Sequence, residues 1–130
     1  MSLTVTDKQI DKARKRELGK EEFVNIIRTS LPFAFQAVES LAGRLNSGEH
    51  IAIEAPLHMA DGDRNQLLRV FASTSMRHAL EDHFGLAELA FQNCHYIGGA
   101  DVEGLDDERW QIFTSIEGQV LAQRPELRDC

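Results

Sequence analysis

The stretch IAIEAPLHMADGDRNQLLRVFASTSMRHALEDHF, residues 51–84, constrains the fold more than any other part of the chain. It starts with an alternating pattern that puts Ile51 and Ile53 on one face of a short strand, and Pro56 ends that strand. A Gly/Asp turn follows, and Asp61 or Asp63 is suited to cap the next helix. We expect one long helix, closed by Gly85 at its C′ position. Its apolar side gathers Leu67, Leu68, Phe71, Ala72, Met76 and Ala79.

Helical patterns come before this stretch. Residues 1–19 form a charged helical lead-in with only a thin apolar line over 7–18. Residues 20–31 and 32–45 carry wider apolar stripes, and Pro32 separates them. Two helices that meet at 29–32 are favoured over one kinked helix. The turn NSGE then provides Asn46 or Gly48 for a left-handed cap.

The last third of the chain predicts one more strand and one more helix. Residues 88–97 are rich in β-compatible side chains and run into Gly98–Gly99, so a strand is expected to end there. Asp106 or Asp107 is suited to cap a final helix that Pro125 ends. The expected apolar stripe of that helix consists of Trp110, Phe113, Ile116, Val120 and Leu121.

These elements predict an α+β fold, with a small two-stranded sheet packed against four to five helices. At 130 residues, one domain over 1–130 is expected. Two strands alone bury little surface, so a second copy of the chain would be needed to complete the sheet. We therefore expect a homo-oligomer.

Composition and charge narrow the function. With 42% hydrophobic and 27% charged residues, the chain is neither disordered nor a membrane protein. It has no apolar run of about 20 residues and no apolar N-terminal signal, which indicates the cytoplasm. Cys94 and Cys130 are accordingly expected to be free thiols.

The net charge of −7 is uneven, because residues 1–28 carry seven basic and five acidic side chains, which leaves −9 for the remainder. A nucleic-acid partner is not expected, since most of the chain would repel phosphate. The basic lead-in is instead a candidate surface for a protein partner or a second copy. Its candidate partner-binding residues are Lys8, Lys12, Arg14, Lys15 and Arg16.

Several polar groups are candidates for chemistry. His58, Asp61 and Asp63 lie close in sequence, but they match no zinc spacing and no complete calcium loop, so a helix cap is favoured. Ser75, His78 and Asp82 share one side of the long helix, which lacks the strained turn that a serine nucleophile needs. Adjacent strand residues Cys94 and His95 point to opposite faces. Glu117 falls within an apolar stripe, where a rim position or an arginine partner is expected.

The sequence therefore favours a non-enzymatic accessory or regulatory protein that acts through protein–protein contacts as a homodimer. It predicts no cofactor, no metal and no catalytic residue. The alternative is a small ligand- or metal-binding enzyme, with a pocket around the 58–63 turn and the 78–83 helix end. The candidate ligand-binding residues of that pocket are His58, Asp61, His78, Asp82, His83 and His95.

Overall fold

The computed structural model describes residues 2–55, 60–92 and 95–121. Within these ranges the fold is α+β, with seven α-helices and one three-stranded antiparallel sheet. The helices are α1 (Asp7–Arg14), α2 (Lys20–Ser30), α3 (Pro32–Asn46), α4 (Asp61–Phe71), α5 (Thr74–Phe84), α6 (Glu108–Phe113) and α7 (Ile116–Leu121). The strands are β1 (Ile51–Glu54), β2 (Glu88–Gln92) and β3 (Tyr96–Ala100), and a 3₁₀ turn, η1, spans Glu103–Asp106.

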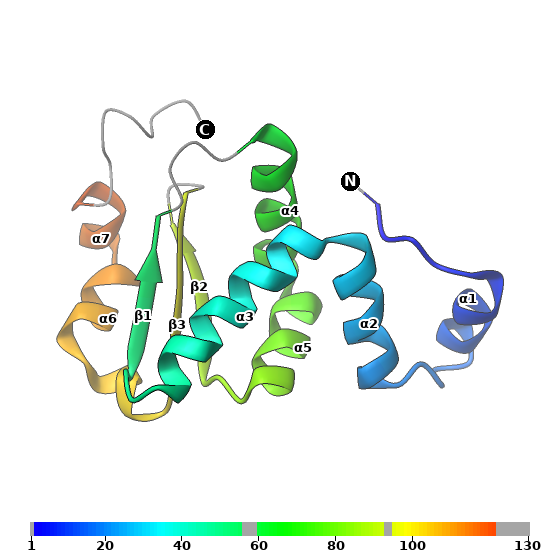
Figure 1. Ribbon diagram of the computed structural model, residues 1–130, viewed down its shortest axis with the longest axis horizontal. Coiled ribbons are helices and arrows are strands. Elements are labelled where there is room, and N and C mark those ends of the chain that lie inside the picture. Colours follow the sequence, from blue (N-terminus) through cyan, green and yellow to red (C-terminus); the bar gives the residue numbers. More distant parts are fainter. Residues whose placement is uncertain (1, 56–59, 93–94, 122–130) are drawn as a thin grey trace.

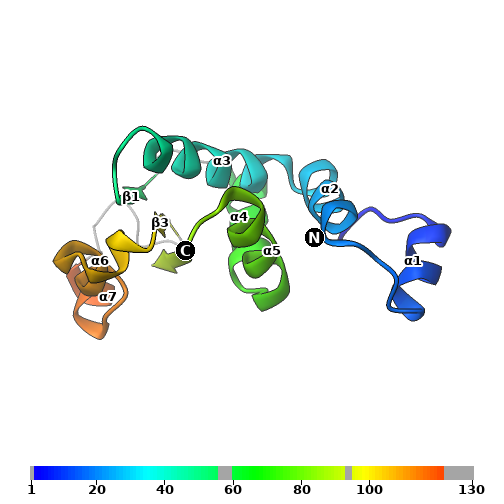
Figure 2. The ribbon, with the colours of Figure 1, turned by 90° about the horizontal axis from the view of Figure 1, so that it is seen from below.

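The sheet lies between two layers of helices (Figures 1 and 2). The central strand β3 pairs with β1 on one side and β2 on the other. Two adjacent glycines of β3 mark its two faces, because successive strand residues point to opposite sides. A Cβ on Gly98 would meet Trp110 and Phe113 of α6, whereas one on Gly99 would meet Leu41 of α3.

The larger core fills the space between the sheet and helices α2 to α5. Its fully buried members include Ile27, Leu31, Val38, Leu41, Leu67, Val70, Leu80 and Ile97. A smaller core lies under α6 on the opposite face and joins Ile51, Ala100, Trp110 and Phe113. Each face of the sheet thus has its own apolar cover.

The predicted two-stranded sheet is wrong, because residues 88–97 do not form a single strand. They supply β2 and the start of β3, which pair as an antiparallel hairpin. Gly98 and Gly99 continue β3 instead of ending a strand. The physical reason is the close approach of α6, whose rings lie where a side chain at position 98 would otherwise stand.

The predicted long helix is also wrong. Two helices, α4 and α5, meet at Ala72 and Ser73, and the Ser73 hydroxyl accepts a hydrogen bond from the Met76 N–H at 3.2 Å. Serine favours such a cap over a helix interior, and the break lets α4 pack on α3 while α5 packs on α2. The predicted cap by Asp61 or Asp63 is wrong as well, since Ala60 is the N-cap of α4 and no side chain caps it.

The final helix divides too. Between α6 and α7, the Ser115 hydroxyl donates to the Ile112 carbonyl at 2.6 Å and accepts from the Gly118 N–H at 3.1 Å. Trp110 and Phe113 are buried as expected. The rest of the predicted stripe is wrong: Ile116, Val120 and Leu121 are 71–82% exposed. Glu117 is exposed beside them on α7.

Predictions that rested on local signals are confirmed. The strand at 51–54 is present, and α2 and α3 are separate helices around Leu31. Gly48 and Gly85 both adopt positive φ, and Asp107 caps α6. The lead-in forms α1, which stands apart from the body in Figure 1 and buries none of its residues. None of the helices in the described ranges is long and apolar enough to cross a membrane.

Candidate functional site

A hollow of about 550 Å³ runs along the outer edge of β2. One wall is α5, the other is formed by the region from η1 to α7, and β2 is the floor. We call it the β2 groove. It is lined by Arg77, His78, Glu81, Ala87, Glu88, Leu89, Ala90, Phe91, Gln92, Leu105, Phe113, Thr114, Ser115 and Gln119.

Strand β2 sends its side chains alternately toward the two walls. Leu89 and Phe91 belong to the larger core side, where the Phe91 ring lies 5.2 Å from that of Phe71. Glu88 points to the α6 side and accepts a hydrogen bond from the Trp110 indole N–H at 3.1 Å. The Leu89 N–H faces outward and donates to Glu81 Oε2 on α5 at 2.8 Å.

Two carboxylates of the groove therefore have fixed positions but no strong cation beside them. Among the described residues, no lysine or arginine lies within ion-pair distance of Glu81 or Glu88, and the His78 imidazole places its Nε2 3.9 Å from Glu81 Oε1. Arg77 lines the same groove, but its guanidinium donates to the Phe71 carbonyl at 3.0 Å. The groove thus carries one acidic side chain on its α5 wall, Glu81, and one on its β2 floor, Glu88.

Gln92 lies at the far end of β2 and is only 7% exposed. Its Nε2 donates to the Phe113 carbonyl, which ties β2 to the end of α6. Its Oε1 is buried and has no hydrogen-bond partner. Gly118 permits this arrangement, because a Cβ there would collide with Gln92 Nε2 and with the Ile112 carbonyl. A buried acceptor without a donor is uncommon and marks a place where a donor would be favoured.

A second polar cluster lies at the opposite end of the sheet. His50 Nδ1 is 2.9 Å from Asp101 Oδ2, and His50 Nε2 is 3.1 Å from Glu103 Oε2. The hydrogen bond with Asp101 is the main reason why the pKa of His50 is raised, and the same bond lowers the pKa of Asp101. The Gly104 N–H also donates to Asp101 at 2.7 Å. Sequence reasoning missed this cluster, because 51 residues separate the histidine from Asp101.

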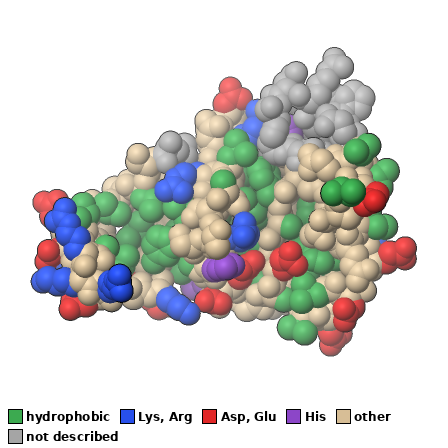
Figure 3. Space-filling model, turned by 180° about the vertical axis from the view of Figure 1, so that it is seen from behind, with side chains coloured by type: hydrophobic (Ala, Val, Ile, Leu, Met, Phe, Trp, Pro, Cys, Tyr) green, Lys and Arg blue, Asp and Glu red, His purple; other side chains and the backbone are tan. Residues whose placement is uncertain are grey.

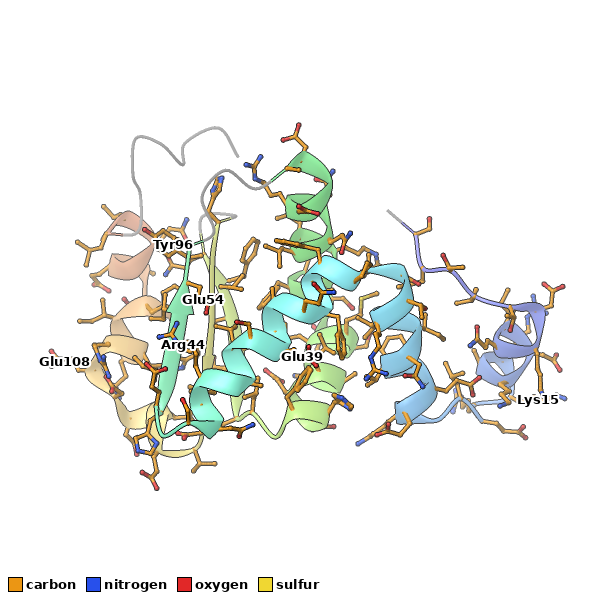
Figure 4. The ribbon with its side chains drawn as sticks, in the orientation of Figure 1. Lys15, Glu39, Arg44, Glu54, Tyr96 and Glu108 are labelled. Carbon is orange, nitrogen blue, oxygen red and sulfur yellow. The ribbon has the colours of Figure 1, made fainter. Side chains whose placement is uncertain are left out.

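A third cluster fastens α3 to β1, and Figure 4 shows Arg44 pointing toward Glu54. Arg44 contacts Glu49 at 3.0 and 3.1 Å and Glu54 at 3.4 Å. The Glu49 hydrogen bond is the main cause of the raised pKa of Arg44, and it lowers the pKa of Glu49 in return. Both carboxylates are paired with Arg44, so this cluster stabilises the packing of α3 against β1.

The structure places the described residues among the predicted ligand-binding residues at several separate sites. His58 lies outside the described residues. Asp61 is exposed and contacts Arg64 at 3.4 Å. His78 lines the β2 groove, whereas Asp82 and His83 line a different hollow of about 120 Å³ against α2.

Asp82 is paired there with Lys20 at 3.1 Å, and the His83 ring packs edge-on against Phe84. His95 is 4% exposed and precedes β3. Within the described ranges, no three His, Cys, Asp or Glu side chains are grouped closely enough to hold a metal ion.

The basic lead-in is tied to the body by few polar contacts. Lys12 pairs with Glu22 at 3.0 Å, and its hydrogen bond is the main cause of the lowered pKa of Glu22. Lys15, labelled at the far end of the molecule in Figure 4, pairs within α1 with Asp11 at 3.3 Å. Lys8, Arg14 and Arg16 belong to the same exposed segment.

An apolar surface covers the outer side of α6 and α7. It consists of Ile112, Ile116, Val120 and Leu121, all of them exposed, and we call it the α7 patch. It borders a shallow hollow of about 230 Å³ that also contains Ile53, Tyr96 and Arg109. Figure 3 shows hydrophobic side chains at the surface over this end of the molecule. The sequence predicted Ile116, Val120 and Leu121 as part of a core stripe and did not single out Ile112.

A protein-family model described as NucS shadow ORF matches residues 1–130. The chain belongs to this family. No curated protein and no solved structure matches the chain.

The name of the family model also carries the letters KH. KH modules bind nucleic acid through a GXXG loop that clamps four backbone nucleotides. The present sequence contains no Gly-x-x-Gly stretch, and α4 and α5 are joined by Ala72 and Ser73. The name therefore transfers no nucleic-acid-binding residue to this chain.

Proposed function

We propose that this member of the NucS shadow ORF family is an accessory protein that acts through protein–protein contacts as a homodimer. The observation that carries the proposal is the α7 patch, where four large aliphatic side chains lie exposed on two short helices. Exposed apolar patches are typical of protein-interaction sites.

A second copy is the partner that the patch fits most simply. In a two-fold dimer the same surface of each copy faces the other, so a patch without charged members is self-complementary. Burial of one aliphatic side chain contributes about 1.5–3 kcal/mol, and a symmetric dimer would bury eight of them. The shallow hollow next to Ile112 and Leu121 offers a place for side chains of the other copy.

Sedimentation equilibrium in the micromolar range tests this proposal. The wild-type chain is expected to be a dimer, and Ile116→Asp is expected to be a monomer because it buries a charge in the interface. Ile116 is 82% exposed, so this substitution should not unfold the chain. Val102→Asp is the matched control: Val102 is 76% exposed and lies outside the patch, next to η1.

The expected pattern is dimer, monomer and dimer for the wild type, Ile116→Asp and Val102→Asp, with identical far-ultraviolet circular dichroism. A monomeric wild type, or equal dissociation by both substitutions, would contradict the proposal.

The alternative function, a small ligand- or metal-binding enzyme, draws on a single observation, the position of His78 in the wall of the β2 groove. Asp82 and His83 line a different hollow, and Asp61 points to solvent. Since a catalytic or metal site needs several such groups to converge, protein contacts are the better-supported function.

A further inference from the structure

We propose that the β2 groove binds an extended, positively charged peptide segment of another protein, which pairs with the outer edge of β2 as an additional strand. This site is separate from the α7 patch. It therefore goes beyond the proposed dimerisation and does not depend on it.

Among the described strands, β2 lies at an edge of the sheet, and its outward Leu89 N–H is bonded to the Glu81 side chain. Within the described residues β2 pairs only with β3, which makes it an edge of the sheet. Its Leu89 N–H points away from β3, as the bond to Glu81 shows, and strand geometry repeats every two residues, so the peptide groups of Phe91 point outward too. Edge strands with outward N–H and C=O groups are the surfaces to which extended peptides add.

The Glu81 side chain occupies a hydrogen-bonding position on the outer edge of β2. Its carboxylate satisfies the Leu89 N–H from the neighbouring helix, as the carbonyl of an added strand would do. An acidic side chain in this position also discourages nonselective pairing with other sheets. A peptide that supplies a cation to Glu81 removes that obstacle, which makes a basic segment the preferred occupant.

The charge of the groove supports the same partner. Glu81 extends from the α5 wall and Glu88 from the β2 floor, each held by an N–H donor and neither paired with a described lysine or arginine. A lysine or arginine side chain placed between them gains charge-assisted hydrogen bonds. A phosphate backbone would be repelled.

Gln92 provides an independent observation at the other end of the groove. Its Oε1 is an acceptor without a donor in a side chain that is more than nine-tenths buried. Glu81 of α5 and Glu88 of β2 thus place two carboxylate acceptors beside this strand, and Gln92 adds a buried acceptor at its far end. A ligand rich in N–H donors fits this set.

The dimensions suit a short peptide. The five residues of β2 extend about 16 Å at roughly 3.3 Å per residue. The volume of about 550 Å³ falls within the range of roughly 300–1,000 Å³ typical of ligand sites. We therefore expect contact with about five residues of the partner.

Fluorescence anisotropy with two labelled heptapeptides tests the charge requirement. One peptide alternates valine and lysine, and the other alternates valine and glutamate. We expect the full chain to bind the lysine peptide and not the glutamate peptide. Glu81→Gln and Glu88→Gln each keep a hydrogen-bond acceptor but remove a charge, so each should weaken binding about fivefold. Glu117→Gln, outside the groove on α7, should leave the affinity unchanged.

N-methylation tests the strand pairing. Two versions of the lysine peptide, methylated at alternate backbone nitrogens in complementary sets, differ only in which N–H groups remain. Because only one set of N–H groups faces β2, one version should lose binding while the other keeps it. A shift of register by one residue cannot restore binding, since it would exchange valine and lysine positions. Equal affinity of both versions would overturn the added strand.

Other results overturn the proposal as a whole. These are failure of the lysine peptide to bind, equal binding of the glutamate peptide, and stronger binding of a single-stranded oligonucleotide. Self-association that the lysine peptide abolishes would identify a second copy as the occupant instead. Ile116→Asp separates the two proposals, because it should bind the lysine peptide like the wild type whatever its oligomeric state.

Discussion

Replacement of Gly98 by alanine tests the packing of α6 on the sheet. A Cβ built at this position lies 2.8 Å from Phe113 Cε1 and 2.8 Å from Trp110 Cζ3. Ordinary contacts of a Cβ begin at 3.4 Å, so the two rings must withdraw by about 0.6 Å to reach such a contact. Gly98 has no positive φ, and backbone strain therefore does not contribute.

The expected cost is about 2 kcal/mol of unfolding free energy, within the range of about 1–3 kcal/mol for overpacked cores. The aromatic rings are stiff and buried, which argues against a smaller value. The short helix α6 has only six residues and is able to shift as a unit, which argues against a larger one. Gly99→Ala is the matched control: its nearest contact is 3.5 Å, so the change should stay within about 0.5 kcal/mol.

Urea denaturation measures both variants. With a slope of about 1–3 kcal/mol per molar urea, Gly98→Ala should lower the midpoint by about 1 M. The chain contains a single tryptophan, so a change in fluorescence would report the displacement of Trp110 directly. Equal midpoints for the two variants would refute the close approach of α6 to β3.

Three further substitutions test local features. His50→Gln should flatten the decline in the free energy of unfolding above about pH 6.5, measured by urea denaturation. The raised pKa of His50 stabilises the fold at pH values below the unfolded-state pKa, and this contribution is lost as the pH rises through the folded-state pKa. An unchanged pH dependence of stability in this variant would contradict the His50–Asp101 contact. Ser73→Ala removes the cap of α5 and should cost about 1 kcal/mol by thermal denaturation, whereas Ser75→Ala should be nearly neutral. Gly85→Ala forces φ near 70° on a residue with a side chain and should cost about 1 kcal/mol in the same assay, a loss that would be absent if α5 ended elsewhere.

Local signals explain which predictions succeeded. Pro32, Gly85 and Asp107 each act on the backbone within a few residues, so the helix boundaries near them could be predicted from sequence. The alternation in HIAIEA likewise fixed β1, because one face of a strand must be apolar to lie on a core.

The candidate site could be predicted only in small part. His78 was identified from its helix face, but the groove beside it also requires Glu88 and Gln92 of β2 and residues of α6 and α7. Neither carboxylate of the groove stood out, since a glutamate in a helix or at a strand end is ordinary. Their significance comes from the tertiary structure, in which no described lysine or arginine lies within ion-pair distance of either carboxylate.

The sequence alone determined the α+β class, the strand at 51–54 and most helix ends, because these depend on periodicity and on capping by neighbouring residues. The tertiary structure decided the third strand, the break at Ser73 and the exposure of Ile116. The third strand depends on the packing of α6 against Gly98, and the break at Ser73 depends on the packing of α4 on α3. Ile116 is exposed because no described element covers α7. Such pairings between distant segments cannot be read from local pattern, since several are compatible with the same sequence and packing selects one.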